Sequence, residues 1–292
     1  MSRVVIAGAG ALGQSLATRL QATHEVRLAK ADLTTVHETE VAFAGAQTVV
    51  MLARTNGPVA KLSRAAPADL DLLLADSVAR AAKLVGVKHL VHFACGDDDA
   101  RVPLLERAGV PLSVLRGGGP DPVELLAAMV NSGPGAKSMT TPAWTGPARA
   151  AKEPTHLNCS VQRYVRPAGW SALDFARAYF TWLPSDVPTV KTVERAGAFT
   201  IDIAGVRALV LRHVPGRSSD DLAWLEVSNG ALVRRGGGLG RFEFRVLLDQ
   251  VTVVASLVGY ESALPFPLYR FTQAAMHERV MRHFGAWLET QP

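Results

Sequence analysis

Short apolar runs alternate with longer amphipathic stretches through the first 115 residues. The apolar runs, which predict buried strands, are residues 3–7, 25–29, 48–53, 89–94 and 112–115. The amphipathic stretches, with apolar positions three or four apart, predict helices over residues 12–20, 35–44, 70–84, 102–107 and 121–130. Because strands and helices alternate, this part is predicted to be an α/β domain with a parallel, doubly wound sheet.

The second half has a different pattern, with one helix at residues 171–183 followed by many strands. The predicted strands, bounded by Gly, Pro or Asn-Gly, are residues 157–166, 189–194, 198–203, 208–213, 222–227, 241–248 and 251–258. Phe242 and Phe244 alternate with Glu243 and Arg245, which predicts an antiparallel sheet with one buried face. Asp249-Gln250 is expected to form a two-residue hairpin turn. A long helix over residues 267–288 is predicted to close the chain.

A stretch rich in Gly, Pro, Ser, Thr and Ala separates the two patterns. We therefore predict an α/β domain over residues 1–135, a linker over 136–156 and an antiparallel α+β domain over 157–292. The order of elements in the second domain is similar to the helix-grip fold of START-like domains. That resemblance implies an apolar cavity for a lipid-like ligand, and a fully packed core is the alternative.

Composition and charge narrow the class of protein. The chain has 292 residues, of which 48% are hydrophobic and 20% charged, as expected for a folded protein of two domains. The net charge of +5 is spread evenly over both halves, so no nucleic-acid partner is expected. Two distant cysteines, Cys95 and Cys159, predict neither a disulfide framework nor a metal site. The apolar stretch at residues 251–260 is too short to cross a bilayer, so we expect a cytoplasmic protein without a transmembrane segment.

The run Gly8-Ala9-Gly10-Ala11-Leu12-Gly13 has the pattern GxGxxG and lies between the first predicted strand and helix. In this context Gly8 permits a tight turn, and Gly10 permits a pyrophosphate to approach the backbone. Gly13 lets the helix pack against the strand, and the N–H groups of the first helical turn attract the anion. The motif predicts a dinucleotide site.

Four stretches together resemble the atypical short-chain dehydrogenase/reductases, in the NAD-dependent epimerase and NmrA-like group. They are VVIAGAGALG, ADLTT, SVARAAKLVGVKHLVHFAC and LLERAGVPLSVLRGG. The resemblance covers about residues 1–135 and implies NAD or NADP as cofactor. It places the pyrophosphate on Gly8, Ala11, Leu12 and Gly13, next to Gly10 of the motif. It places the adenine beside Asp32 and Leu33, and the ribose and nicotinamide near Leu52, Ala53 and Arg54.

Two departures from that family concern its chemistry. Only Arg27-Leu28-Ala29-Lys30 separates the second strand from the ADLTT turn, so the loop that grips the adenosine ribose is nearly absent. Arg27 or Lys30 is either its replacement or a solvated charge. The Tyr-x-x-x-Lys pair is also missing, since no Tyr precedes Tyr164. Without that pair carbonyl reduction has no evident general acid, and we assign no catalytic residue.

Other polar residues near the strand ends leave alternatives open. Cys95 is either a nucleophile near His92 or an inert buried thiol. The acids at residues 97–99 either bind a cation or form a solvated loop or helix cap. His89 and His92, three positions apart on one strand, are expected to point in opposite directions.

The sequence is therefore compatible with three functions. One is an NAD(P)-dependent oxidoreductase or epimerase-like enzyme with an apolar substrate. The second is a catalytically inactive binding or regulatory protein, with a possible lipid-like ligand in the C-terminal domain. The third is a structural subunit of a larger protein complex.

Overall fold

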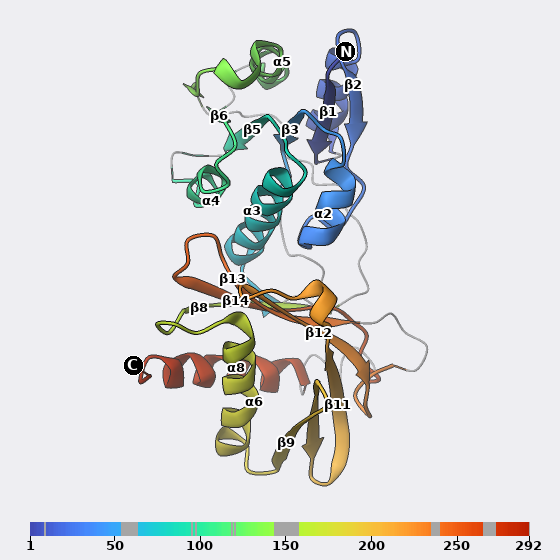
Figure 1. Cartoon of the computed structure of the whole chain (residues 1–292), viewed down its shortest axis with the longest axis vertical. Helices are drawn as coiled ribbons and strands as arrows, with labels where there is room; N and C mark the ends of the chain where they lie inside the picture. The colour runs from blue at the N-terminus through green and yellow to red at the C-terminus, as the bar shows by residue number, and fades with distance from the viewer. Residues whose placement is uncertain are drawn as a thin grey trace. The chain divides into compact units, whose positions relative to one another are not determined.

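A computed structural model describes residues 1–8, 10–53, 64–94, 96, 98–117, 119, 121–142, 158–234, 240–264 and 273–291. The chain forms two compact units. Unit 1 comprises residues 1–57 and 70–153, and unit 2 comprises residues 58–69 and 154–292. Figure 1 shows the helices and strands of the whole chain.

Unit 1 contains a parallel sheet with the strand order β2-β1-β3-β5-β6-β7. Its strands are β1 (Arg3–Ala7), β2 (Glu25–Leu28), β3 (Thr48–Met51), β5 (His89–Ala94), β6 (Leu112–Arg116) and β7 (Met139–Thr140). Its helices are α1 (Ala11–Leu20), α2 (Val36–Phe43), α3 (Pro67–Leu84), α4 (Val102–Glu106) and α5 (Pro122–Ser132), with a 3-10 turn at Gly133–Gly135. The predicted Rossmann-like α/β class is confirmed.

Helices pack on both faces of this sheet. On one face, Leu16 and Leu20 of α1 and Leu126 of α5 form a core with apolar residues of β1, β3, β5 and β6. On the other face, Val102 of α4 contacts Ala94 at the end of β5. Burial on both faces explains why the strands are apolar runs without alternation.

Side-chain caps fix where two of these helices begin. Asp121 accepts a hydrogen bond from Glu124 N at 3.1 Å, and Pro122 occupies the first turn of α5. The cap of α2 is Thr35, whose Oγ1 accepts from Glu38 N at 3.3 Å. The Asp32 carboxylate instead accepts hydrogen bonds from Thr34 and closes the preceding turn.

Unit 2 contains a larger sheet with the strand order β4-β8-β14-β13-β12-β11-β10-β9. Its strands are β4 (Arg64–Ala65), β8 (Asn158–Val165), β9 (Val190–Arg195), β10 (Ala198–Ile203), β11 (Val206–His213), β12 (Leu222–Asn229), β13 (Arg241–Val246) and β14 (Thr252–Tyr260). All pairs are antiparallel except β4 with β8. The predicted antiparallel α+β class with a long C-terminal helix is confirmed, with α8 at Gln273–Leu288.

Two helices pack on the inner face of this sheet, and Figure 1 shows α8 crossing α6 (Ala172–Asp186). A capping box starts α6: Ser171 Oγ accepts a hydrogen bond from Asp174 N, and the Asp174 carboxylate accepts one from Ser171 N. Aromatic rings fill the space between the helices and the sheet: Tyr164, Phe175, Tyr179, Phe242, Phe244 and Phe284. The ring-rich core explains why so many aromatic residues follow position 164.

The central strand β13 differs from the prediction of one buried face. Its burial is continuous, and Glu243 and Arg245 are both fully buried on the face opposite Phe242 and Phe244. Arg245 Nε donates to Glu243 Oε1 at 2.5 Å, and Arg241 Nε lies 3.4 Å from Glu243 Oε2. Glu243 and Arg245 therefore neutralise each other inside the protein, although the alternating sequence pattern predicts that both face solvent.

The connection from β13 to β14 is longer than the predicted two-residue turn. Leu247 N donates to Thr252 O at 2.8 Å, and Gln250 N donates to Leu247 O at 2.9 Å. Gln250 has a left-handed φ of 64°. The Asp249 carboxylate accepts hydrogen bonds from Val251 N and Thr252 N, which stabilises this wider turn.

The division of the chain differs from the predicted boundaries in two places. Residues 58–69 belong to unit 2, because β4 adds a short parallel strand beside β8. Strand β7 lies within the predicted linker, where it pairs with β6 and extends the sheet of unit 1. Strands of two residues carry no hydrophobic pattern, so neither contact was predicted.

Candidate functional site

The carboxyl ends of β1 and β3 define the topological switch point of the parallel sheet. From β1 the chain continues to β2 on one side, and it then returns past β1 to β3 on the other. Connections leave the sheet in opposite directions at this point, and ligands of open α/β sheets bind in the crevice that results. The residues that directly follow β1 are the glycines of the GxGxxG motif.

Two of the motif glycines are required by packing within the protein. Gly8 has a left-handed φ of 131°, and a Cβ there would lie 2.9 Å from Ala53 N. A Cβ on Gly13 would lie 1.9 Å from Gly8 O. The turn after β1 therefore packs closely against α1 and the end of β3. No residue larger than glycine fits at position 8 or position 13.

Gly10 is not required by its own backbone geometry. It is the N-cap of α1, with φ −67° and ψ −178°, a conformation that any residue adopts. It provides no side-chain acceptor for the first-turn N–H groups, and the first turn contains no acidic residue. The start of α1 thus presents partial positive charge that neither its N-cap side chain nor an acidic residue of its first turn balances. Ala11 is exposed, and Leu12 is half-buried against the core.

The end of β3 lies directly against the glycine turn. Leu52 N and Ala53 N both donate to Ala7 O, at 2.8 and 2.7 Å. These bonds bring Leu52 and Ala53 against Gly8. Arg54 and Cys95 lie outside the described residues.

The short connection after β2 contains Asp32 and Leu33, the residues beside which the family resemblance places the adenine. Leu33 is buried, and the Asp32 carboxylate accepts from Thr34 N at 3.0 Å and from Thr34 Oγ1 at 2.5 Å. Arg27 donates to Ala44 O at 2.8 Å, at the end of α2. Lys30 is exposed at the carboxyl end of β2. Arg27 and Lys30 are the two basic residues that the sequence offers in place of the missing loop. Of these, Arg27 is hydrogen-bonded to the end of α2.

A buried polar cluster at the same edge of the sheet was not predicted. His92 Nε2 lies 3.1 Å from Asp99 Oδ2, and Arg101 Nε donates to Asp99 Oδ1 at 2.8 Å. Arg101 also donates to Ala53 O at 3.1 Å, while His92 Nδ1 lies 3.3 Å from Met51 O. The cluster therefore ties the loop after β5 to the end of β3. Asp99 is a buried ion-pair partner, so the expectation of a solvated loop is wrong for this residue.

Burial and charge determine the protonation of this cluster. Burial lowers the pKa of His92 below its ordinary value, although the hydrogen bond to Asp99 opposes the shift. Burial alone would raise the pKa of Asp99, but hydrogen bonds from His92 and Arg101 and the Arg101 charge hold it well below its ordinary value. The cluster thus contains a neutral imidazole and an ion pair at pH 7. The sequence did not indicate that the Arg101 side chain pairs with the nearby Asp99 carboxylate.

The stability of the protein is expected to fall as the pH drops below 6.5, the ordinary pKa of histidine. Folded His92 binds fewer protons than unfolded His92 in this range, so protonation favours the unfolded state. Asp99 acts in the same direction at lower pH, below its unfolded pKa of about 3.9. Urea unfolding at pH 7 and pH 5 measures the effect. His92→Gln should reduce the pH dependence, and His37→Gln, at an exposed position on α2, should leave it unchanged.

His89 lies on the same strand but belongs to a different contact. Its Nε2 lies 2.8 Å from Ser113 Oγ on β6, whereas His92 contacts the end of β3 and Asp99. The two rings therefore have separate partners, as expected for positions three apart on a strand. Within the described ranges, no group of three or more His, Cys, Asp or Glu side chains is arranged to hold a metal ion.

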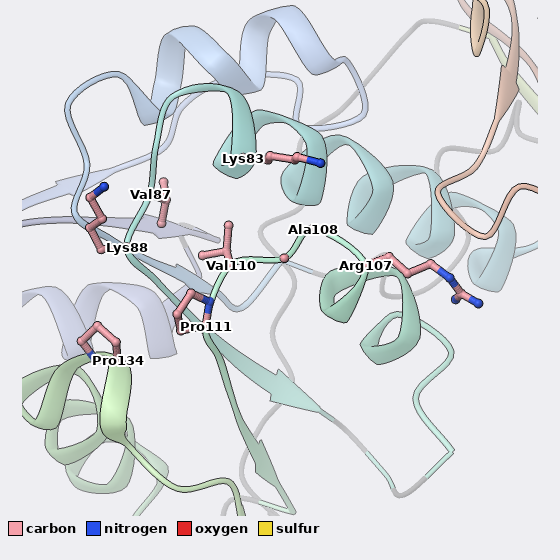
Figure 2. A pocket seen from close by; sticks show the side chains of 9 residues that line it. Lys83, Val87, Lys88, Arg107, Ala108, Val110, Pro111 and Pro134 are labelled. Atoms are coloured by element: carbon pink, nitrogen blue, oxygen red, sulfur yellow. The ribbon is translucent and has the colours of Figure 1, made fainter.

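A separate hollow of about 560 Å³ lies at the opposite, amino edge of the parallel sheet. Figure 2 shows that its lining comes from the ends of α3 and α4 and from the segments before β5 and β6. Lys83, Lys88 and Arg107 are exposed at its rim. Ligands of open α/β sheets bind at the carboxyl edge, so we place the candidate site at the glycines.

The described helices include none that is both long and apolar enough to cross a membrane. No protein-family model matches the chain. Among curated proteins, the auxiliary protein GraX of Staphylococcus aureus is 28% identical over 128 residues. That match covers 43% of this chain and 41% of GraX, so the chain spans less than half the length of this relative.

Solved structures match the N-terminal part of the chain. The Bordetella bronchiseptica enzyme WbmG in complex with NAD is 21% identical, with a TM-score of 0.34, over 39% of this chain and 52% of WbmG. A nucleoside-diphosphate-sugar epimerase of Staphylococcus aureus is 17% identical, with a TM-score of 0.32, over 40% of this chain and 50% of the epimerase. A GDP-D-glycero-L-gluco-heptose synthase of Campylobacter jejuni, in the presence of NADPH, is 19% identical, with a TM-score of 0.32, over 39% and 46% of the two chains.

Of these three proteins, one is an epimerase, one was solved in complex with NAD, and one is a synthase solved in the presence of NADPH. The chain spans about half of each matched structure. With identities of 21% or less and TM-scores of 0.34 or less, these likenesses do not transfer an activity or a substrate to this chain.

Proposed function

We propose that unit 1 binds a nicotinamide dinucleotide at the carboxyl ends of β1 and β3. Gly10 is the observation that carries this proposal. Gly8 and Gly13 are required by contacts within the protein, whereas the ordinary φ and ψ of Gly10 leave its missing side chain without a backbone reason. An anion that approaches the N-terminus of α1 supplies that reason.

The rest of the proposed site follows from the residues beside the glycine turn. The pyrophosphate would contact Gly10, Ala11 and Leu12 at the start of α1. The adenine would lie beside Asp32 and Leu33. The ribose and nicotinamide would lie near Leu52–Arg54. In this segment Leu52 N and Ala53 N donate hydrogen bonds to Ala7 O. The cofactor would supply hydride chemistry, and the protein would supply binding and orientation.

We further propose that unit 1 does not reduce carbonyl groups with the Tyr-x-x-x-Lys pair of the family that its motifs resemble. The sequence has no Tyr before Tyr164. Among the described residues at this edge of the sheet, His92 is buried and neutral, and its Nε2 already faces Asp99. A general acid must reach the reacting atom, and His92 does not meet that condition. These features favour a binding or regulatory role over catalysis.

Lys30 is expected to make NADPH the preferred ligand. It lies about 20 residues after the glycines, where dinucleotide folds contact the 2′ position of the adenosine ribose. Its ammonium group favours a phosphate there, while the Asp32 carboxylate already accepts hydrogen bonds from Thr34. Lys30→Met should weaken NADPH binding about 3- to 10-fold and leave NADH binding nearly unchanged.

Fluorescence titration with both nucleotides measures this preference. The matched control is Lys88→Met, which removes another exposed lysine at the amino edge of the same sheet. Equal loss of NADPH affinity in both variants would show that Lys30 contributes only general charge. An unchanged NADPH affinity in Lys30→Met would remove Lys30 from the site.

Thermal unfolding in the presence of NADPH or NADH tests the proposed function. A ligand that binds the folded state raises the melting temperature with its concentration. We expect a concentration-dependent rise with NADPH. The absence of a rise with either nucleotide at millimolar concentration would contradict the proposal and favour a structural role for unit 1.

A further inference from the structure

One buried arginine, Arg101, connects the loop after β5 to the end of β3. It directly precedes α4, and its side chain is shielded from solvent. Its guanidinium uses one edge for Asp99: Nε donates to Asp99 Oδ1 at 2.8 Å, and Nη2 donates to Asp99 Oδ2 at 2.5 Å. The remaining nitrogen, Nη1, donates to Ala53 O at 3.1 Å. The planar fork of arginine therefore contacts both partners at the same time.

The end of β3 is held from two sides. Ala53 N donates to the carbonyl of the last residue of β1 at 2.7 Å, and Ala53 O accepts from Arg101. His92 adds a second contact from the side of β5, because its Nδ1 lies 3.3 Å from Met51 O and its Nε2 lies 3.1 Å from Asp99 Oδ2. The position of this strand end therefore depends on the loop after β5 as well as on β1.

Arg101 acts on this strand end without presenting its charge to a ligand. The Asp99 carboxylate lies against the guanidinium and neutralises it, and both side chains are buried. Arg101 is therefore not placed to attract a phosphate group directly. Its contribution is the position of the Ala53 peptide group, which the hydrogen bond from Nη1 fixes.

The proposed dinucleotide would pass over this strand end. Its pyrophosphate would lie at the start of α1, and its adenosine half would lie toward β2, beside Asp32 and Leu33. The other half would then extend to the opposite side of the switch point, where β3 and β5 follow β1 in the sheet. Ala53 lies just after β3 on that side.

We propose that Arg101 is a positioning residue for the nicotinamide half of the dinucleotide, which it serves by holding Ala53 O at the end of β3. This inference rests on the function proposed for unit 1. It has a consequence that a general effect on folding lacks: loss of the contact weakens only ligands that contain the nicotinamide half. A nucleotide that consists of the adenosine half alone is bound as before.

NADPH and adenosine 2′,5′-bisphosphate separate the two halves, because the second contains only the adenosine with its phosphates. Arg101→Lys keeps a positive charge beside Asp99, but a single ammonium nitrogen does not reproduce the fork that also reaches Ala53 O. This variant should lower NADPH affinity about 3- to 10-fold relative to adenosine 2′,5′-bisphosphate. The matched control is Arg107→Lys at the other end of α4, where the arginine is exposed, and it should leave both affinities unchanged.

Calorimetric titration measures both affinities, and the melting temperature checks the fold. If Arg101→Lys does not fold, Asp99→Asn combined with Arg101→Met replaces it, because that variant removes both buried charges together. The inference is overturned if a folded variant keeps the original affinity ratio, or if both nucleotides lose affinity equally. If the unaltered protein binds neither nucleotide, the proposed function fails and the inference fails with it. Binding of both nucleotides with an unchanged ratio in the variant overturns the inference alone.

Discussion

Replacement of Glu243 by glutamine is expected to lower the free energy of unfolding of unit 2 by about 3–5 kcal/mol. Glu243 and Arg245 are fully buried on one face of β13, and Arg245 donates to Glu243 Oε1 at 2.5 Å. Glutamine keeps the volume but removes the negative charge. The buried Arg245 guanidinium then loses the charge of Glu243, which is far more costly than the loss of a hydrogen bond between neutral groups.

Urea unfolding followed by circular dichroism measures this effect. The matched control is Glu194→Gln, which breaks an ion pair between half-exposed side chains, Arg177 and Glu194, in the same unit. Surface pairs of this kind contribute about 0–1 kcal/mol. Simultaneous replacement of Arg241, Glu243 and Arg245 by methionine should recover much of the loss, because the buried charges that pair with one another are removed together. Equal effects of Glu243→Gln and Glu194→Gln would show that the buried charges are compensated in another way.

Gly10→Val is expected to weaken dinucleotide binding by about 100-fold or more. The valine side chain would occupy the space through which the pyrophosphate approaches the N–H groups of α1. The φ of −67° at Gly10 is ordinary, so the substitution introduces no left-handed strain. Loss of binding without loss of fold therefore separates Gly10 from Gly8 and Gly13, whose replacement creates clashes within the protein.

Nucleotide fluorescence measures the binding, and the melting temperature checks the fold. Gly135→Val is the control in the same unit, because a Cβ there meets no atom within 4 Å. That variant should bind as the unaltered protein does. If the folded Gly10→Val variant still binds NADPH with its original affinity, the pyrophosphate does not lie at the start of α1.

The parallel sheet could be predicted from the sequence because its determinants are local. Runs such as residues 48–53 are apolar throughout, and the glycine motif directly follows such a run. The short connection through Arg27 and Lys30 also predicted that the loop after the second strand is nearly absent. The observed order places β2 at the edge beside β1, in agreement with that shortening.

Contacts between distant segments could not be predicted in the same way. Strand β4 has two residues, and only its pairing with β8 brings residues 58–69 into unit 2. Alternation in β13 assigned Glu243 and Arg245 to one face but did not indicate that this face is buried. The contact of Arg101 with Ala53 O joins residues 48 positions apart. Each of these features depends on tertiary packing, which a local pattern does not specify.

Calorimetric titration of the unaltered chain with NADPH is the most direct test of the central claim, that the glycine turn of unit 1 is a dinucleotide site. The account predicts saturable binding with one site per chain, and the loss of that binding in a folded Gly10→Val variant. Absence of saturable binding by both NADPH and NADH at millimolar concentration would contradict it.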